Sequence, residues 1–160
     1  MLLRASDTYQ ERKAKYLGYL YANVAFDSTA SPAEANFLLS VADRLTYRGF
    51  VLLALFDLGW TNEIARAEHK RPADVRPGET ANADLLGEMN DLGNYGLLGL
   101  RQKEGFVATY QSVLDGGDFT RLPLTQIRQT AVGERLYELL GLENIPSSDI
   151  REVVEELRHW

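Results

Sequence analysis

The longest uninterrupted apolar run of the sequence, residues 50–56, places the strongest constraint on the fold. It lies between Arg48 and Asp57. A helix that spans a bilayer needs about 20 apolar residues, so this run is too short to cross a membrane. Thr46 can cap a helix that carries the run. We therefore expect a buried helix over residues 45–56 at the centre of the hydrophobic core.

Amphipathic patterns predict two helices before this run. Residues 6–26 have the apolar spacing of one helix face. Ser31, Pro32 and Glu34 then provide an N-cap, a proline at the first helical position and an acid three residues after the cap, which marks the start of a second helix. The two helices are expected to bury one stripe each: Leu17, Leu20, Tyr21 and Val24 on the first, and Phe37, Leu38, Val41 and Leu45 on the second.

The second half of the chain mixes helix and strand patterns. Residues 106–114 contain strand-favouring Val, Thr and Tyr, but their apolar spacing is helical, and we assign them to a helix. Gly141 ends a helix, and Ser147, Ser148 or Asp149 can cap the last one. The expected helices cover residues 62–68, 83–91, 106–114, 131–140 and about 147–157, and the expected strands cover residues 97–101 and 124–130.

The order of these elements resembles a winged-helix domain over about residues 45–140. In winged-helix families a helix commonly runs into a Gly-Leu-aliphatic sequence at the first wing strand, and Gly96-Leu97-Leu98 matches this point. The second wing strand often leads into a Leu-Thr-x-x-Gly helix start, which Thr130-Ala131-Val132-Gly133 matches from its threonine onward. The long stretch between the two strands departs from the family pattern. The resemblance implies a mainly α domain with a small β hairpin; a purely helical bundle with a small hairpin is the alternative.

Length and composition favour one domain. The 160 residues divide into an N-terminal helical pair (1–45), a winged-helix-like core (46–140) and a C-terminal helix (141–160). The N-terminal helices resemble those of uncharacterised bacterial helical domains, and that resemblance implies no activity. The chain has no Cys, which excludes disulfides, thiolate metal sites and cysteine nucleophiles. The polar residues near the N-terminus do not match a signal peptide, so we expect a cytoplasmic protein of bacterial type.

Charge argues against DNA binding through the helix that would enter the groove. Between residues 81 and 100 the chain carries Asp84, Glu88 and Asp91 but no Lys or Arg, whereas phosphate contacts need cations. The formal net charge is −6. A DNA-binding regulator would have to use the basic first helix and the loop that follows residue 68. We keep that regulator as an alternative.

The residues favour a non-catalytic protein-interaction or regulatory module, with a protein partner or self-association as a dimer. Two His and no nucleophile or phosphate-loop motif leave no evident catalytic, cofactor or metal site. We expect no membrane contact and no small-molecule substrate, and a carboxylate-based metal hydrolase is a further alternative. Tyr16 and Tyr19 are candidate anchors, with packing against Phe26, Tyr47 or Trp160 as their structural alternative. The candidate partner-binding residues are Arg12, Lys13, Tyr16, Tyr19, Lys70 and Arg71.

Overall fold

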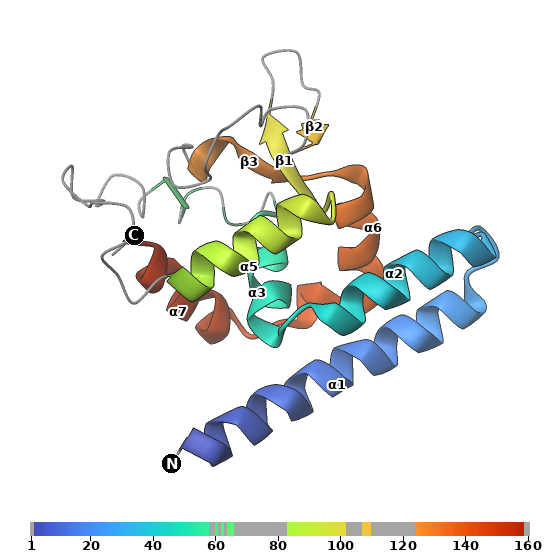
Figure 1. Cartoon of the computed structure of the whole chain (residues 1–160), viewed down its shortest axis with the longest axis horizontal. Helices are drawn as coiled ribbons and strands as arrows, with labels where there is room; N and C mark the ends of the chain where they lie inside the picture. The colour runs from blue at the N-terminus through green and yellow to red at the C-terminus, as the bar shows by residue number, and fades with distance from the viewer. Residues whose placement is uncertain are drawn as a thin grey trace.

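The chain forms a mainly helical structure with a small antiparallel sheet (Figure 1). This computed structural model describes residues 2–57, 60, 62, 64–65, 83–101, 107–109 and 124–158. Its helices are α1 (Leu2–Phe26), α2 (Pro32–Arg44), α3 (Tyr47–Leu55), α5 (Ala83–Asn94), α6 (Ala131–Leu140) and α7 (Ser147–Arg158). Its strands are β1 (Leu98–Arg101), β2 (Val107–Thr109) and β3 (Ile127–Gln129), and 3₁₀ turns cover Leu124–Gln126 and Leu142–Asn144.

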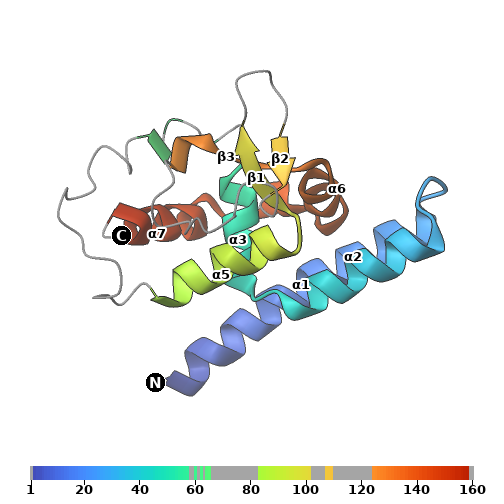
Figure 2. The ribbon, with the colours of Figure 1, turned by 45° about the horizontal axis from the view of Figure 1, so that its top comes forward.

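Helices α1 and α2 form an antiparallel hairpin along one edge of the molecule, as both views show (Figures 1 and 2). The predicted start of the second helix is confirmed, because the Ser31 hydroxyl accepts a hydrogen bond from the Glu34 amide at 3.1 Å and Pro32 is the first helical residue. In the connecting turn, the Asp27 carboxylate accepts bonds from the amide and the hydroxyl of Thr29. The hairpin therefore has a defined turn and a capped second helix.

Helix α3 lies at the centre of the core, as predicted. The Thr46 hydroxyl accepts the Gly49 amide at 2.9 Å and so caps the helix. All α3 residues except Arg48 are buried. Helices α1, α5, α6 and α7 all contact α3, so four amphipathic faces bury their apolar side chains against one helix.

The sheet has the order β2-β1-β3, and both strand pairs are antiparallel. Leu100 of β1 pairs with Ala108 on one side and with Ile127 on the other. At the end of β3, the Thr130 amide donates to the Leu97 carbonyl at 3.0 Å, and the Thr130 hydroxyl donates to the Gly96 carbonyl at 2.5 Å. These bonds join the turn after α5 to the start of α6.

Some local predictions are wrong. Residues 107–109 form a strand and not a helix, because their backbone pairs with β1; the rest of the segment 106–114 lies outside the described residues. The strand predicted over residues 124–130 is confined to 127–129, after a 3₁₀ turn. The last helix begins at Ser147, and the Asp149 side chain contacts Arg12 and Tyr47 and does not cap the helix.

Two aromatic side chains predicted to be buried are exposed. Tyr21 is 60% exposed and Phe37 is 47% exposed. Tyr21 is exposed because it lies about 140° of helix rotation from Tyr16 and about 100° from Leu20, the two α1 side chains that are buried in the core. No helix in the described part of the chain is long and apolar enough to cross a membrane.

Candidate functional site

The cations predicted on α1 contact groups within the chain. Arg12 forms a 2.7 Å ion pair with Asp149, and the Lys13 ammonium donates to the Asp43 carbonyl at 2.5 Å. The Lys15 ammonium lies 5.3 and 5.7 Å from the ring centroids of Tyr16 and Tyr19. These contacts fasten α1 to α2 and α7. The other predicted cations, Lys70 and Arg71, lie outside the described residues.

The two candidate tyrosines have different environments. Tyr16 is 2% exposed, and its hydroxyl donates to the Asn144 carbonyl at 3.2 Å. Its ring stacks on that of Tyr47, with 6.0 Å between the two ring centroids. Tyr16 is therefore a core residue, which corrects its expected place on an exposed surface. Tyr19 is 40% exposed and packs edge-on against Tyr16. Of these two residues, only Tyr19 offers a surface to a partner.

Asp149 of α7 binds the N-terminal half of α1. The same oxygen of Asp149 accepts bonds from the Tyr47 hydroxyl at 2.7 Å and from Arg12. Burial, together with the Asp149 hydrogen bond and charge, raises the pKa of the Tyr47 hydroxyl far above its usual value. The Tyr47 hydroxyl therefore stays protonated, as a donor to Asp149, to a higher pH than an exposed tyrosine would.

Arg48 joins three helices beside this contact. It donates to Glu88 of α5 at 2.6 Å and to Glu156 of α7 at 3.3 Å, and the Thr46 hydroxyl donates to Glu88 at 2.6 Å. An open hollow of about 560 Å³ lies next to this cluster. Its lining mixes cations with the carboxylates that neutralise Arg48, so its charges do not select a ligand of one sign. The pairs are far apart in sequence, and no local pattern predicts them.

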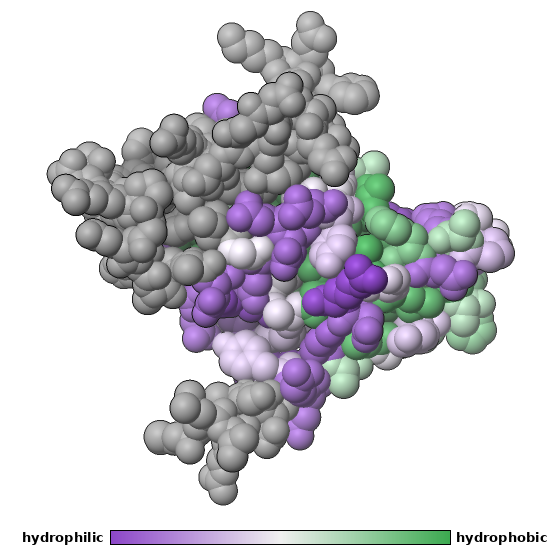
Figure 3. All heavy atoms as spheres, in the orientation of Figure 1, coloured by the Kyte–Doolittle hydropathy of each residue, from purple (hydrophilic) through white to green (hydrophobic). Residues whose placement is uncertain are grey.

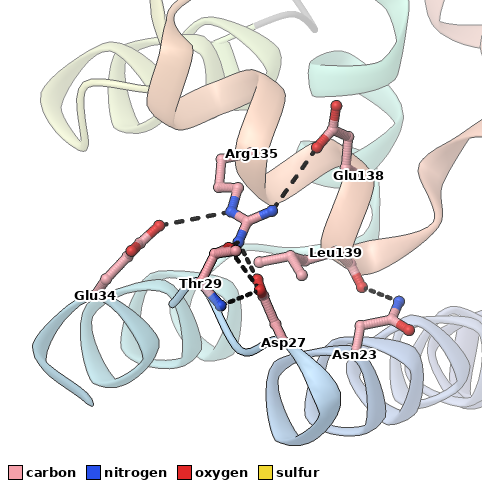
Figure 4. Close-up of polar contacts among 7 residues, drawn as sticks. All are labelled: Asn23, Asp27, Thr29, Glu34, Arg135, Glu138 and Leu139. Atoms are coloured by element: carbon pink, nitrogen blue, oxygen red, sulfur yellow. Dashed lines mark hydrogen bonds and ion pairs between the residues drawn. The ribbon is translucent and has the colours of Figure 1, made fainter. Parts of the chain in front are cut away.

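Arg135 of α6 holds the turn end of the hairpin (Figure 4). Its guanidinium binds the Asp27 carboxylate, donates to the Thr29 hydroxyl at 3.0 Å and lies 3.6 Å from Glu34. Hydrogen bonds from Thr29, with a further contribution from Arg135, hold the pKa of Asp27 below its usual range. Nearby, the Asn23 amide donates to the Leu139 carbonyl at 2.8 Å. The hairpin is thus fixed to α6 as well as to α7.

The C-terminal part of α1 also carries an exposed apolar surface. Phe26 is 90% exposed there, and Tyr19 and Tyr21 are 40% and 60% exposed. No charged residue occurs from Tyr16 to Phe26, and this absence of charge is the sequence signal that could have located the surface. We call this surface the α1 outer face and define it by six exposed residues: Gly18, Tyr19, Tyr21, Ala22, Ala25 and Phe26.

The side of the molecule shown in Figure 3 carries both polar and apolar surface. Hydrophilic side chains gather over α5, and hydrophobic ones gather over α2 and α6. The acidic residues of α5 include Asp84, Glu88 and Asp91, as the sequence predicts. Within the described residues, no group of three or more His, Asp or Glu side chains could hold a metal ion.

The exposed aromatic side chains of α1 make its outer face the candidate functional surface. Aromatic side chains are enriched among the residues that contribute most to protein binding. Comparison of the chain with models of protein families, with curated proteins and with solved structures finds no match.

Proposed function

We propose that this chain is a non-catalytic protein-interaction or regulatory module that binds its partner through the α1 outer face. The single observation that carries this proposal is the 90% exposure of Phe26, on a helix that carries two further exposed aromatic side chains. Burial of an exposed Phe side chain stabilises a complex by about 1.5–3 kcal/mol. One such ring at the centre of an interface is enough to act as an anchor.

The way α1 is held supports this proposal. Asp149, Asn144 and Leu139 bind three side chains on its inner side, and Arg135 binds the turn that follows it. A helix fixed in this way presents its outer side chains in one arrangement, so binding does not have to order the backbone first.

We further propose that the core is winged-helix-like and serves as the scaffold for this hairpin. The two points of the resemblance meet in space, because Thr130 hydrogen-bonds to Gly96 and Leu97. Helix α5, which would be the groove-reading element, has three carboxylates and no Lys or Arg and would repel phosphate. We therefore assign the partner contact to α1 and not to α5.

Site-specific photo-crosslinking tests the proposal. The chain has no Cys, so Ala22→Cys provides a unique attachment point for a benzophenone on the α1 outer face, and Gly87→Cys provides one on the exposed side of α5. In an extract of the source cells, we expect a defined protein adduct from position 22 that disappears with Phe26→Ser. It should persist with Phe37→Ser, which changes an exposed aromatic residue of α2.

The adduct must be identified by mass spectrometry and must form again with the purified partner or, if it is a dimer, with the purified chain. Equal labelling from positions 22 and 87, or an adduct that survives Phe26→Ser, would contradict the assignment.

A further inference from the structure

Three residues of the α1 outer face form one ridge of the helix. Gly18, Ala22 and Phe26 are spaced four residues apart, and all three are exposed. Rows with this spacing are the ridges that pack into the grooves of a neighbouring helix. Along the ridge the side chain grows from a hydrogen atom at Gly18 to a methyl group at Ala22 and a phenyl ring at Phe26. A Cβ atom built on Gly18 would have no heavy atom within 4 Å, so the space above it is open.

We propose that the partner on this ridge is a second copy of the chain, packed antiparallel through a two-fold axis at Ala22. The inference rests on the proposed interaction function and names its partner. Gly18 and Phe26 lie at equal distances on either side of Ala22. In this arrangement the Phe26 ring of each copy occupies the space over Gly18 of the other copy. Tyr19 and Ala25 are likewise equidistant from Ala22, so Tyr19 packs over Ala25.

Self-complementarity favours a second copy over another protein. A two-fold interface uses the same patch on both subunits, so each large side chain must meet a small one of the same patch. The α1 outer face meets this condition twice, with Phe26 over Gly18 and Tyr19 over Ala25. The patch also has no charged residue between Tyr16 and Phe26, so two copies bring no like charges together at its centre. The openness of Gly18 alone would not suffice, because Gly87 of α5 is equally open.

The available area fits a reversible dimer. If a fully exposed ring offers about 200 Å², the exposed parts of Tyr19, Tyr21 and Phe26 amount to about 380 Å² per chain. Two copies then provide about 760 Å², with Tyr21 at the rim, and the backbone and methyl groups of the small residues add to this area. The total approaches the ~1,000 Å² that a specific interface exceeds. We therefore expect a small interface with a dissociation constant in the micromolar range.

Analytical ultracentrifugation of the full chain from about 1 to 100 μM tests the proposal. We expect the mass to rise from monomer to dimer over this range. Gly18→Gln should weaken the dimer at least tenfold, because its side chain fills the space that the Phe26 ring needs. The same change should raise the urea midpoint of the monomer, since glycine is a poor helix former. Gly87→Gln is the matched control and should leave the dimer intact.

Disulfide trapping tests the direction of the two helices. Ala22→Cys should form a covalent dimer rapidly on mild oxidation, because the axis brings the two thiols together. Ala14→Cys lies on the same helix and is also exposed, but its two copies would be about 24 Å apart along the axis at 1.5 Å per residue. Equal trapping at both positions would indicate parallel helices and would overturn the arrangement.

The outcomes separate this inference from the proposed function. If the wild-type chain stays monomeric up to about 100 μM, the proposal that its partner is a second copy is wrong. A Phe26-dependent adduct with a different protein at position 22 would then still support the interaction function. Absence of both the dimer and any such adduct would overturn both proposals.

Discussion

Gly133→Ala tests the contact between the turn after α5 and the start of α6. A Cβ atom at this position would lie 2.1 Å from the Leu97 carbonyl oxygen. The two segments would have to separate by about 1 Å to regain van der Waals distance. That shift costs about 1–3 kcal/mol as overpacking. It also removes the two hydrogen bonds from Thr130 to Gly96 and Leu97, at about 1 kcal/mol each.

The substitution also brings a gain, because alanine is better than glycine inside a helix by about 0.5–1 kcal/mol. The net expectation is a loss of about 2–4 kcal/mol in the free energy of unfolding, which lowers the urea midpoint by about 1–2 M at a typical slope. Urea titration followed by circular dichroism measures it. Gly87→Ala is the control: its Cβ meets no heavy atom within 4 Å, so stability should rise by about 0.5–1 kcal/mol. A loss below about 1 kcal/mol for Gly133→Ala would refute the close approach to Leu97.

Two further predictions concern ionisable groups that hold α1. The pKa of Tyr47 is raised in the folded chain, so the folded state keeps a proton that the unfolded chain loses above about pH 10, and the free energy of unfolding should fall as pH rises from there. In urea titrations, Tyr47→Phe should make this fall shallower, whereas Tyr21→Phe, at an exposed position, should not; equal slopes would contradict the buried hydroxyl. Arg135→Gln should speed amide hydrogen exchange in residues 27–34 at neutral pH while the α3 core keeps its protection. Because the pKa of Asp27 is lowered in the folded chain, the wild-type chain should lose the same local protection as the pH falls through the acid range. If exchange in residues 27–34 is unchanged in Arg135→Gln, Arg135 does not hold the turn.

Local chemistry explains which parts of the fold could be predicted from sequence. Ser31 and Thr46 cap their helices as predicted, because a cap depends on residues within one turn. Gly141 ends α6 with a φ of +64°, as its position after an apolar helix suggested. The apolar run 50–56 is long enough to require burial wherever the chain places it. These features depend on residues close in sequence.

Contacts between distant residues explain the errors. Val107–Thr109 is a strand because β1 is there to pair with it, which the helical spacing of the segment could not reveal. Charge alone predicts Arg12 and Lys13 as partner-binding residues, yet Arg12 pairs with Asp149 near the other end of the chain. The position of Tyr16 in the core follows from its contacts with Tyr47 and Asn144. Sequence located the helix that carries the candidate surface, but not the side of it that stays exposed.

The bonds that hold α1 also set an order of events during synthesis. In the α1–α2 hairpin, the residues that bind Arg135, Leu139, Asn144 and Asp149 precede these partners by 108 to 137 residues. At a translation rate of about 5–20 residues per second, these partners are made roughly 5–30 s after the helix itself. Until then the inner side of α1 can dock only on α2 and α3, which follow it directly. A ribosome that stalls before α6 therefore leaves α1 without its contacts to α6 and α7.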